Sequence, residues 1–124
     1  MSLESVRAWL AVHAPDGSLI EAHASTATVL DAAAALGVAP ARIAKTLALR
    51  VNGQVILVVT RGDARLDNAK SKAVLGGRPR MLGADETFTL TGHLVGGVCP
   101  FGLATPLPIY CDQSLRAFDI VYPA

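Results

Sequence analysis

Residues 43–60 read IAKTLALRVNGQVILVVT, and this stretch decides the fold. Two runs rich in apolar and β-branched residues, 43–51 and 54–60, flank the pair Asn52-Gly53. An Asn-Gly pair between two strand-like runs is the strongest short signal for a β-hairpin, because both turn positions adopt a positive φ. The segment 55–59 is apolar without alternation, which predicts a central strand that is covered on both faces.

Four short helices are predicted on either side of this hairpin from apolar side chains at helical spacing, polar capping residues and terminal glycines. They cover residues 3–13, 27–36, 67–75 and 86–91. The residues expected to cap their N-termini are Ser2, Thr26 or Ser25, Asp67 and Asp85. The glycines expected to end the last three helices are Gly37, Gly76 and Gly92.

Further short strands are predicted at residues 19–23, 80–82, 107–111 and 118–122. Short strands interspersed with short helices, and at least one antiparallel hairpin, indicate an α+β fold with a mixed or antiparallel sheet. The chain has 124 residues, of which 52% are hydrophobic, so we expect a single domain over residues 1–124.

Cysteine content and the first residues bear on the compartment. Cys99 and Cys111 are too few for a disulfide framework, so both are expected to be reduced thiols. The N-terminus reads MSLES, with an early acid and no basic region, which is unlike a signal peptide. The longest apolar runs fall far short of the ~20 residues that cross a bilayer. We therefore expect a soluble, cytoplasmic protein without a membrane partner.

Basic residues are concentrated in one stretch although the net charge of the whole chain is only +1. Residues 61–80 hold six basic and two acidic side chains, a local net charge of +4. Such a field can meet a phosphate backbone, and a solvated helix face is the alternative interpretation. The basic residues singled out for a nucleic acid are Arg61, Arg65, Lys70 and Lys72.

Lys45 is the single charge on the more apolar face of the first predicted strand, because residues two apart in a strand share a face. Burial of an unpaired ammonium group is costly. Lys45 is therefore expected to face a cleft or to hold a partner. The alternative is that its long side chain reaches water near the strand end.

A glycine-rich loop, GGVCPFG, covers residues 96–102. Its three glycines permit backbone conformations that direct several N–H groups at a ligand oxygen, although simple turns use glycine as well. The spacing fits neither a Walker A loop nor a dinucleotide-binding fingerprint. Within the loop, Cys99 could act as a nucleophile if a base such as His93 reached it, and a small packing residue is the alternative. The histidines lack metal-ligand spacing, so no metal or cofactor is expected.

Several segments in order resemble one known family. They are AALGV at 34–38 with IAKTL at 43–47, GDARLD at 62–67, TGH at 91–93 with GGVCPFG at 96–102, and YCDQSL at 110–115. Together these motifs, from about Thr26 to the end of the chain, are similar to the YbaK/EbsC (ProX-like) family of aminoacyl-tRNA deacylases. The resemblance implies a curved, largely antiparallel sheet flanked by short helices, related to the editing domain inserted in some bacterial prolyl-tRNA synthetases.

The resemblance also implies a hydrolase that acts in trans on mischarged aminoacyl-tRNA, with Cys-tRNA(Pro) or a related misacylated tRNA as substrate. The implied partners are the tRNA acceptor end and prolyl-tRNA synthetase. The catalytic lysine of the family falls on Lys45 and its catalytic glycines on Gly96 and Gly97. Thr46 is similar to the cysteinyl-type subgroup, since alanyl-type relatives tend to carry Asn there. The remaining substrate-binding positions are Val98, Cys99, Pro100, Phe101 and Gly102.

One departure from the family lies at the C-terminus. Members usually continue past Pro123-Ala124 into a turn, a strand and a helix that help to close the pocket. An incomplete pocket and an exposed apolar strip are therefore among the expectations. Two alternatives to the deacylase follow: a catalytically inactive module that binds tRNA or a synthetase, and a cysteine-dependent redox or hydrolytic enzyme that uses Cys99.

Overall fold

The computed structural model describes residues 3–16, 19 and 26–123. The helices, which include two 3₁₀ turns (η), are α1 (Leu3–His13), α2 (Val29–Leu36), η1 (Pro40–Arg42), α3 (Asn68–Leu75), α4 (Ala84–Thr91) and η2 (Gln113–Ala117). The strands are β1 (Ile43–Val51), β2 (Gln54–Arg61), β3 (Arg80–Met81), β4 (Ile109–Cys111) and β5 (Tyr122–Pro123). The predicted caps Ser2 and Ser25, and most of the predicted strand 19–23, lie outside the described residues.

The five strands form one mixed sheet, which confirms the predicted α+β class. β1 pairs antiparallel with β2 and β3, whereas β4 runs parallel to β2 and β5 runs parallel to β1. Since β2 takes one edge of β1, β3 and β5 share the other edge. There β5 pairs with Ile43 and Ala44, and β3 pairs with Leu49 and Arg50. Among the residues that the structure describes, these two short strands leave a gap between them along β1.

The hairpin has the predicted turn and the predicted buried strand. Asn52 and Gly53 adopt φ values of 51° and 78°, as a two-residue turn that matches the strand twist requires. Every residue from Ile56 to Thr60 in β2 is at most 6% exposed. The Asn52 side chain donates a hydrogen bond of 2.8 Å to the Gly76 carbonyl, so the turn also holds the end of α3.

Several helix ends follow the sequence and two do not. Asp67 caps α3, and Gly37, Gly76 and Gly92 end their helices in the left-handed conformation. The predicted cap Thr26 is wrong: α2 begins two residues later, because the Thr28 hydroxyl accepts the Asp31 N–H at 3.1 Å. Asp85 is not a cap either. It lies in the first turn of α4, which starts after Gly83.

The predicted strand 118–122 is also wrong except at its last residue. Only Tyr122 and Pro123 pair with β1, after the η2 turn that Asp112 caps. Phe118 packs instead against the guanidinium groups of Arg42 and Arg61, and the Ile120 carbonyl accepts a hydrogen bond from Arg42. Side chains from distant segments therefore hold this segment in place of a strand ladder.

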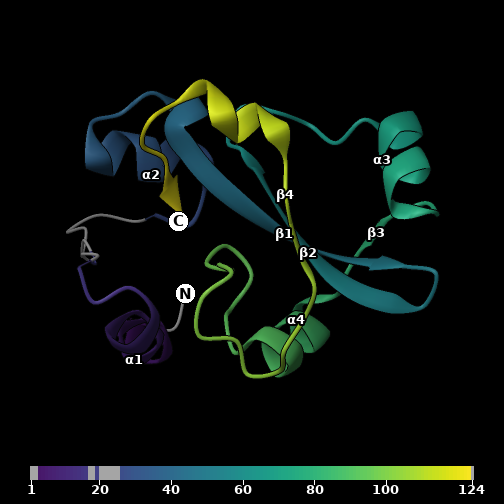
Figure 1. Ribbon diagram of the computed structural model, residues 1–124, viewed down its shortest axis with the longest axis horizontal. Coiled ribbons are helices and arrows are strands. Elements are labelled where there is room, and N and C mark those ends of the chain that lie inside the picture. Colours follow the sequence, from purple (N-terminus) through teal and green to yellow (C-terminus); the bar gives the residue numbers. More distant parts are fainter. Residues whose placement is uncertain (1–2, 17–18, 20–25, 124) are drawn as a thin grey trace.

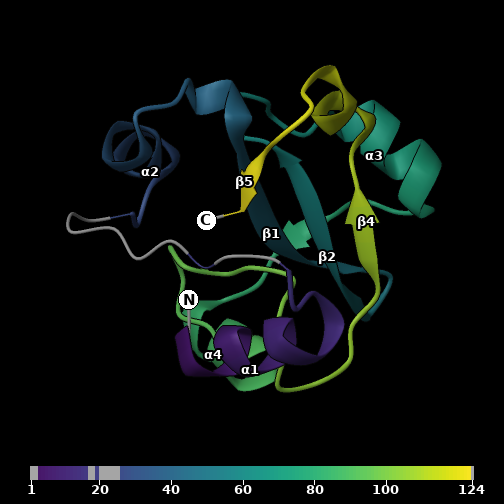
Figure 2. The same ribbon diagram turned by 60° about the vertical axis from the view of Figure 1, so that its left-hand side comes forward.

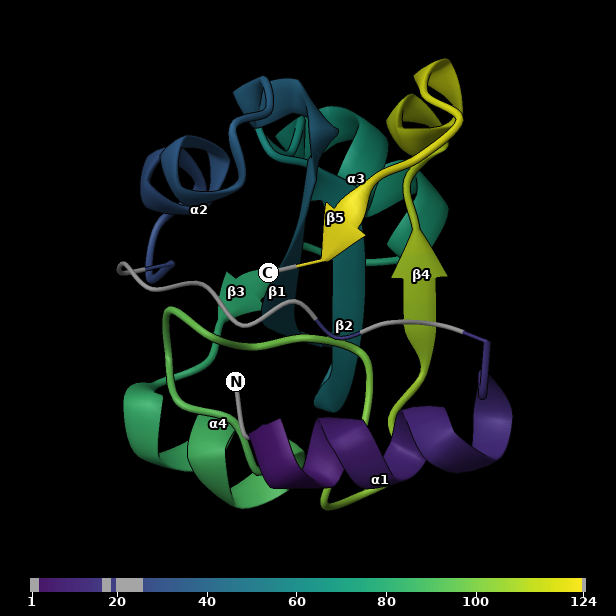
Figure 3. The same ribbon diagram turned by 90° about the vertical axis from the view of Figure 1, so that its left-hand side faces the viewer.

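Helices and loops cover both faces of the hairpin. α3 packs on the face that carries Leu49, Ile56 and Val58, and the loop after α4 packs on the face of Ala48 and Leu57. α1 and α4 lie on the side of this loop, opposite α3 (Figures 1 and 3). α2 flanks the start of β1, and β4 forms the other edge of the sheet (Figure 2).

Candidate functional site

A cavity of about 240 Å³ lies along the open edge of β1, between β3 and β5. It reaches residues of both strand faces, Thr46 and Ala48 on one and Lys45 and Leu47 on the other, so it follows the strand edge. The lining is completed by residues from the start of β1, α2 and the segment before it, the region of β3, α4, and the glycine loop with the residue before it. They are Thr26, Ala27, Thr28, Val29, Ala32, Ile43, Met81, Leu82, Thr87, Val95, Gly96 and Val98.

Thr46 supplies a polar group without a partner in this cavity. Its Oγ1 is buried and makes no hydrogen bond within the part of the chain that the structure describes. Its backbone also points toward the open edge. Residues that flank a two-residue turn exchange both hydrogen bonds, so the even-numbered residues of β1 direct their N–H and C=O groups away from β2. The bond of 3.1 Å from the Leu82 N–H to the Ala48 carbonyl agrees with this register.

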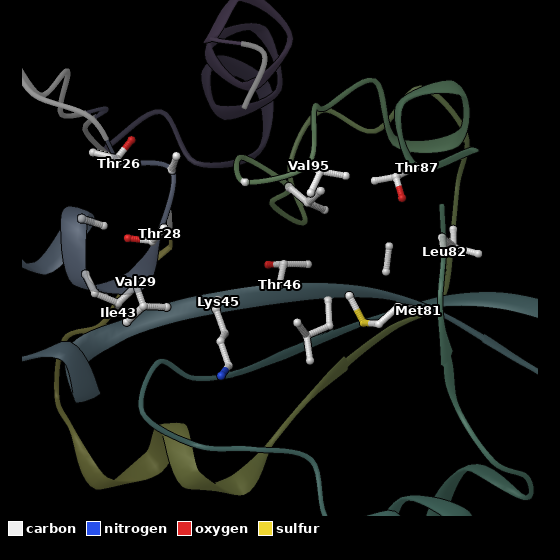
Figure 4. Close-up of a pocket in the computed structure, with 16 residues that line it drawn as sticks. Thr26, Thr28, Val29, Ile43, Lys45, Thr46, Met81, Leu82, Thr87 and Val95 are labelled. Carbon is white, nitrogen blue, oxygen red and sulfur yellow. The ribbon is translucent and has the colours of Figure 1, made fainter. Parts of the chain in front are cut away.

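Lys45 projects from the face of β1 opposite to Thr46 (Figure 4). Its ammonium group donates a hydrogen bond to the backbone carbonyl of Ala64, and its side chain is half-buried. The sequence predicts that Lys45 faces a cleft or holds a partner, and the structure gives it a backbone partner as well as a place in the cavity lining. The charge of Lys45 contributes, after the Arg61 hydrogen bonds, to the lowered pKa of Asp63.

Only part of the glycine loop reaches the cavity. Gly96 and Val98 are lining residues, and a Cβ on Gly96, where φ is +89°, would lie 3.2 Å from the Ala27 carbonyl oxygen. The Gly97 N–H is already used, because it donates to the Leu94 carbonyl at 2.9 Å. Of the two predicted catalytic glycines, Gly96 is therefore the one at the cavity.

The rest of the predicted substrate loop packs against α1. The Trp9 and Phe101 rings lie 5.0 Å apart, and a Cβ on Gly102 would come within 2.5 Å of the Ser5 carbonyl oxygen. Cys99 is fully buried. The cavity lining, as far as the structure describes it, does not include Cys99, Pro100, Phe101 or Gly102. Phe101 and Gly102 therefore fix the position of the loop through contacts with α1, on the side away from the cavity.

His93 and Cys99 are in contact, a pairing that the sequence left open. The Cys99 Sγ lies 3.6 Å from His93 Nε2, and both residues are fully buried. Nε2 lies 2.8 Å from the Phe101 carbonyl oxygen, which only accepts, so Nε2 carries a hydrogen and cannot take the thiol proton. Burial raises the pKa of Cys99 and lowers the pKa of His93. The pair is neutral, which argues against a cysteine nucleophile.

The predicted nucleic-acid residues lie on three successive segments, namely the end of β2, the loop that follows it and α3. Arg61 forms a two-pronged pair with Asp63, at 2.7 and 3.0 Å, which raises the pKa of Arg61. Arg65 is exposed on the loop before α3. Lys70 and Lys72 are exposed on α3 itself, which covers the sheet face opposite to the glycine loop (Figure 1).

Three further observations concern metal ligands, membrane-spanning helices and the rim of the cavity. The described residues contain no cluster of three His, Cys, Asp or Glu side chains that could hold a metal ion. None of the helices described is long and apolar enough to cross a membrane. At the cavity, Met81 and Val95 are 65% and 63% exposed, so its rim is apolar and open.

Comparisons with known proteins agree with this architecture. The family model described as "Aminoacyl-tRNA editing domain" matches residues 23–124. The chain is 47% identical over 125 residues to the uncharacterized protein YwhH of Bacillus subtilis. This match covers 100% of this chain and 80% of YwhH. It is 33% identical over 94 residues to the proline–tRNA ligase of Bacillus licheniformis, where the match covers 75% of this chain and 16% of the ligase.

A solved structure of a protein proposed as a trans-editing enzyme for prolyl-tRNA synthetase superposes with a TM-score of 0.84 at 34% identity. The match covers 93% of this chain and 74% of that one. Family model, sequence relatives and structure agree over most of the chain. The chain therefore belongs to the family of aminoacyl-tRNA editing domains.

Proposed function

We propose that this protein hydrolyses the ester bond of mischarged aminoacyl-tRNA, acting in trans as a separate chain, with Cys-tRNA(Pro) as its first candidate substrate. The observation that carries the proposal is the cavity at the open edge of β1, where Thr46, Gly96 and Lys45 all contribute to the lining. Its family membership supports the same reaction.

The size and lining of the cavity favour a small acyl group. A volume of about 240 Å³ is below the range of roughly 300–1,000 Å³ that holds drug-sized ligands. The lining is largely apolar, with Val29 and Val98 among its residues, and it includes the buried hydroxyl of Thr46. Such a space fits a small side chain with one polar atom, as in a cysteinyl group, and leaves the adenosine of the tRNA outside.

The reaction needs positioning and charge stabilisation more than a strong nucleophile, because an aminoacyl ester is already activated. A water molecule attacks the ester carbon, the bond to the ribose oxygen breaks, and that oxygen takes a proton to give free amino acid and tRNA. In this scheme the backbone of the loop at Gly96 stabilises the developing oxyanion. Lys45 exchanges the Ala64 carbonyl for an acceptor at the aminoacyl or ribose end of the substrate.

The test is deacylation of a panel of charged tRNAs by the wild type and by Lys45→Ala. The panel contains Cys-tRNA(Pro), Ala-tRNA(Pro), Ser-tRNA and correctly charged Pro-tRNA(Pro). We expect turnover of one mischarged species, no turnover of Pro-tRNA(Pro), and a loss of about 100-fold or more in Lys45→Ala. Full activity of the variant would contradict the role given to Lys45, and turnover of none of the panel would contradict the proposed activity.

A second candidate function is a catalytically inactive module that binds tRNA or prolyl-tRNA synthetase. One observation favours it: the ammonium group of Lys45 is bound to the Ala64 carbonyl on the far face of β1. Binding of charged tRNA with no turnover of any species by folded protein is the result that this module predicts.

A further inference from the structure

Two arginines and a phenylalanine form a cluster where β1 begins and β2 ends. The guanidinium carbons of Arg42 and Arg61 lie 4.8 and 5.3 Å from the centroid of the Phe118 ring. All three side chains are half-buried. They come from η1, the end of β2 and the residue after η2, so three distant segments build what we name the Arg42–Phe118–Arg61 cluster.

The cluster holds more positive than negative charge. Arg61 is paired with Asp63, whereas Arg42 donates to the Ile120 carbonyl at 3.3 Å and forms no ion pair with any described carboxylate. Since both guanidinium groups contact one ring, they lie within about 10 Å of each other. That is close to the Debye length of ~8–10 Å at physiological salt, so an approaching anion feels both groups together.

The cluster also borders the cavity. Arg42 directly precedes Ile43, which lines the cavity next to α2. Gly62, which follows Arg61, is packed so tightly that a Cβ there would lie 2.8 Å from the Val29 side chain, another part of the lining. The backbone that carries both arginines therefore adjoins the end of the cavity that Ile43 and Val29 line.

We propose that the Arg42–Phe118–Arg61 cluster binds the phosphate backbone of the single-stranded 3′ end of tRNA, beside the nucleotide that carries the amino acid. This inference rests on the proposed function. Guanidinium groups present planar, two-pronged donors that match phosphate geometry, and they stack on unpaired bases. Phe118 is a positioning residue that keeps the two like charges together.

The first test is binding of a short single-stranded RNA with the sequence of a tRNA 3′ end, labelled with fluorescein and followed by anisotropy. Arg42→Gln is expected to weaken binding and to reduce the slope of log affinity against log salt by about 0.7, as loss of one phosphate contact predicts. The control is Arg78→Gln, which removes an equal charge from an exposed site between α3 and β3 and should leave binding within about twofold. Equal effects of the two variants, or no binding by the wild type, overturn the proposal.

Phe118 provides a second test that separates positioning from folding. Phe118→Leu is expected to lower RNA affinity and the salt slope, whereas Phe118→Tyr, which keeps a ring under both guanidinium groups, is expected to retain them. Thermal denaturation of each variant checks that the protein is folded at the assay temperature. A folded Phe118→Leu protein that binds RNA as the wild type does would contradict the role given to the ring.

A pair of substrates separates this inference from the proposed activity. The Arg42→Gln substitution should raise KM for charged tRNA. The same variant should hydrolyse a 3′-aminoacyl adenosine, which has no phosphate, as fast as the wild type does. RNA binding that depends on Arg42 without any deacylation would uphold the cluster and remove the proposed function. Deacylation of charged tRNA with the same KM in the wild type and in Arg42→Gln would uphold the proposed function and remove the role given to the cluster.

Discussion

Lys45 and Thr46 are neighbours in β1, but they project from opposite faces of the strand and differ in their hydrogen bonding (Figure 4). The Lys45 ammonium group is bound to the Ala64 carbonyl, whereas the Thr46 hydroxyl is buried with no described partner. A buried polar group without a partner costs about 1–3 kcal/mol, and a ligand that bonds to it recovers part of that cost. In the proposed function, Thr46 can therefore bond to a ligand directly, whereas Lys45 must first give up its bond to Ala64.

The largest expected effect on stability tests what fixes the loop on the Thr46 face. Gly102→Ala places a Cβ about 2.5 Å from the Ser5 carbonyl oxygen at a φ of +61°. We expect a loss of about 2 kcal/mol or more in the free energy of unfolding, because both strain and overlap are added. Urea denaturation measures it.

Gly53→Ala is the matched control for that change. Gly53 also has a positive φ, +78°, but a Cβ there meets nothing within 4 Å. Only the conformational cost of about 1 kcal/mol is expected. Equal losses in the two variants would show that the contact between α1 and the loop does not fix the loop.

A smaller effect tests the hydroxyl at the centre of the comparison. Thr46→Val removes a buried group without a partner, so the free energy of unfolding should stay the same or rise by up to about 1 kcal/mol. The rate of deacylation of the preferred substrate should fall, because the ligand can no longer form a hydrogen bond with the Thr46 hydroxyl. Denaturation and single-turnover hydrolysis measure the two effects.

Thr60→Val sharpens the same test on the face of Lys45. Thr60 lies opposite Lys45 in the hairpin and is 2% exposed, and its hydroxyl donates to Asp112 at 3.4 Å. Hydrogen bonds from Ser114, with a smaller contribution from Thr60, hold the pKa of Asp112 below its usual range. Loss of this bond should lower stability by about 1 kcal/mol. If Thr46→Val lowered the free energy of unfolding and Thr60→Val left it unchanged, the Thr46 hydroxyl would be the bonded one, which would contradict the comparison.

The smallest expected effect concerns pH. Burial lowers the pKa of His93 below its usual 6.5, so the unfolded chain takes up a proton on this residue at a higher pH than the folded one does. Stability should therefore fall as the pH drops below about 6.5 toward the lowered pKa of the folded state. His93→Gln, which keeps a donor for the Phe101 carbonyl, should make this slope shallower below about pH 6.5. An unchanged slope in denaturation curves would contradict the buried neutral state.

Local signals predicted a large part of the fold. The Asn-Gly turn, the buried β2 and the glycine ends of three helices depend on short-range conformational preferences. Alternation along β1 also predicted that Lys45 and Thr46 face opposite ways. The prediction of Thr26 as a cap failed because capping propensity does not distinguish Thr26 from Thr28, which was not among the predicted caps.

The parts that the sequence did not predict depend on contacts between distant residues. His93 and Cys99 meet because the loop folds back under α1, with Trp9 against Phe101. The segment around Phe118 has strand-like composition, but cation–π contacts with Arg42 and Arg61 hold it outside the sheet. Local sequence patterns do not predict contacts between residues that are far apart in the chain.

The most direct test of the central claim follows the backbone amide resonances of the protein while a non-hydrolysable 3′-cysteinyl adenosine, with an amide in place of the ester, is added. The largest chemical-shift changes are expected on Thr46, Gly96 and Val98, which line the cavity at the open edge of β1. Changes confined to α3 and the rest of the far face, with these three amides unmoved by saturating ligand, would contradict the central claim.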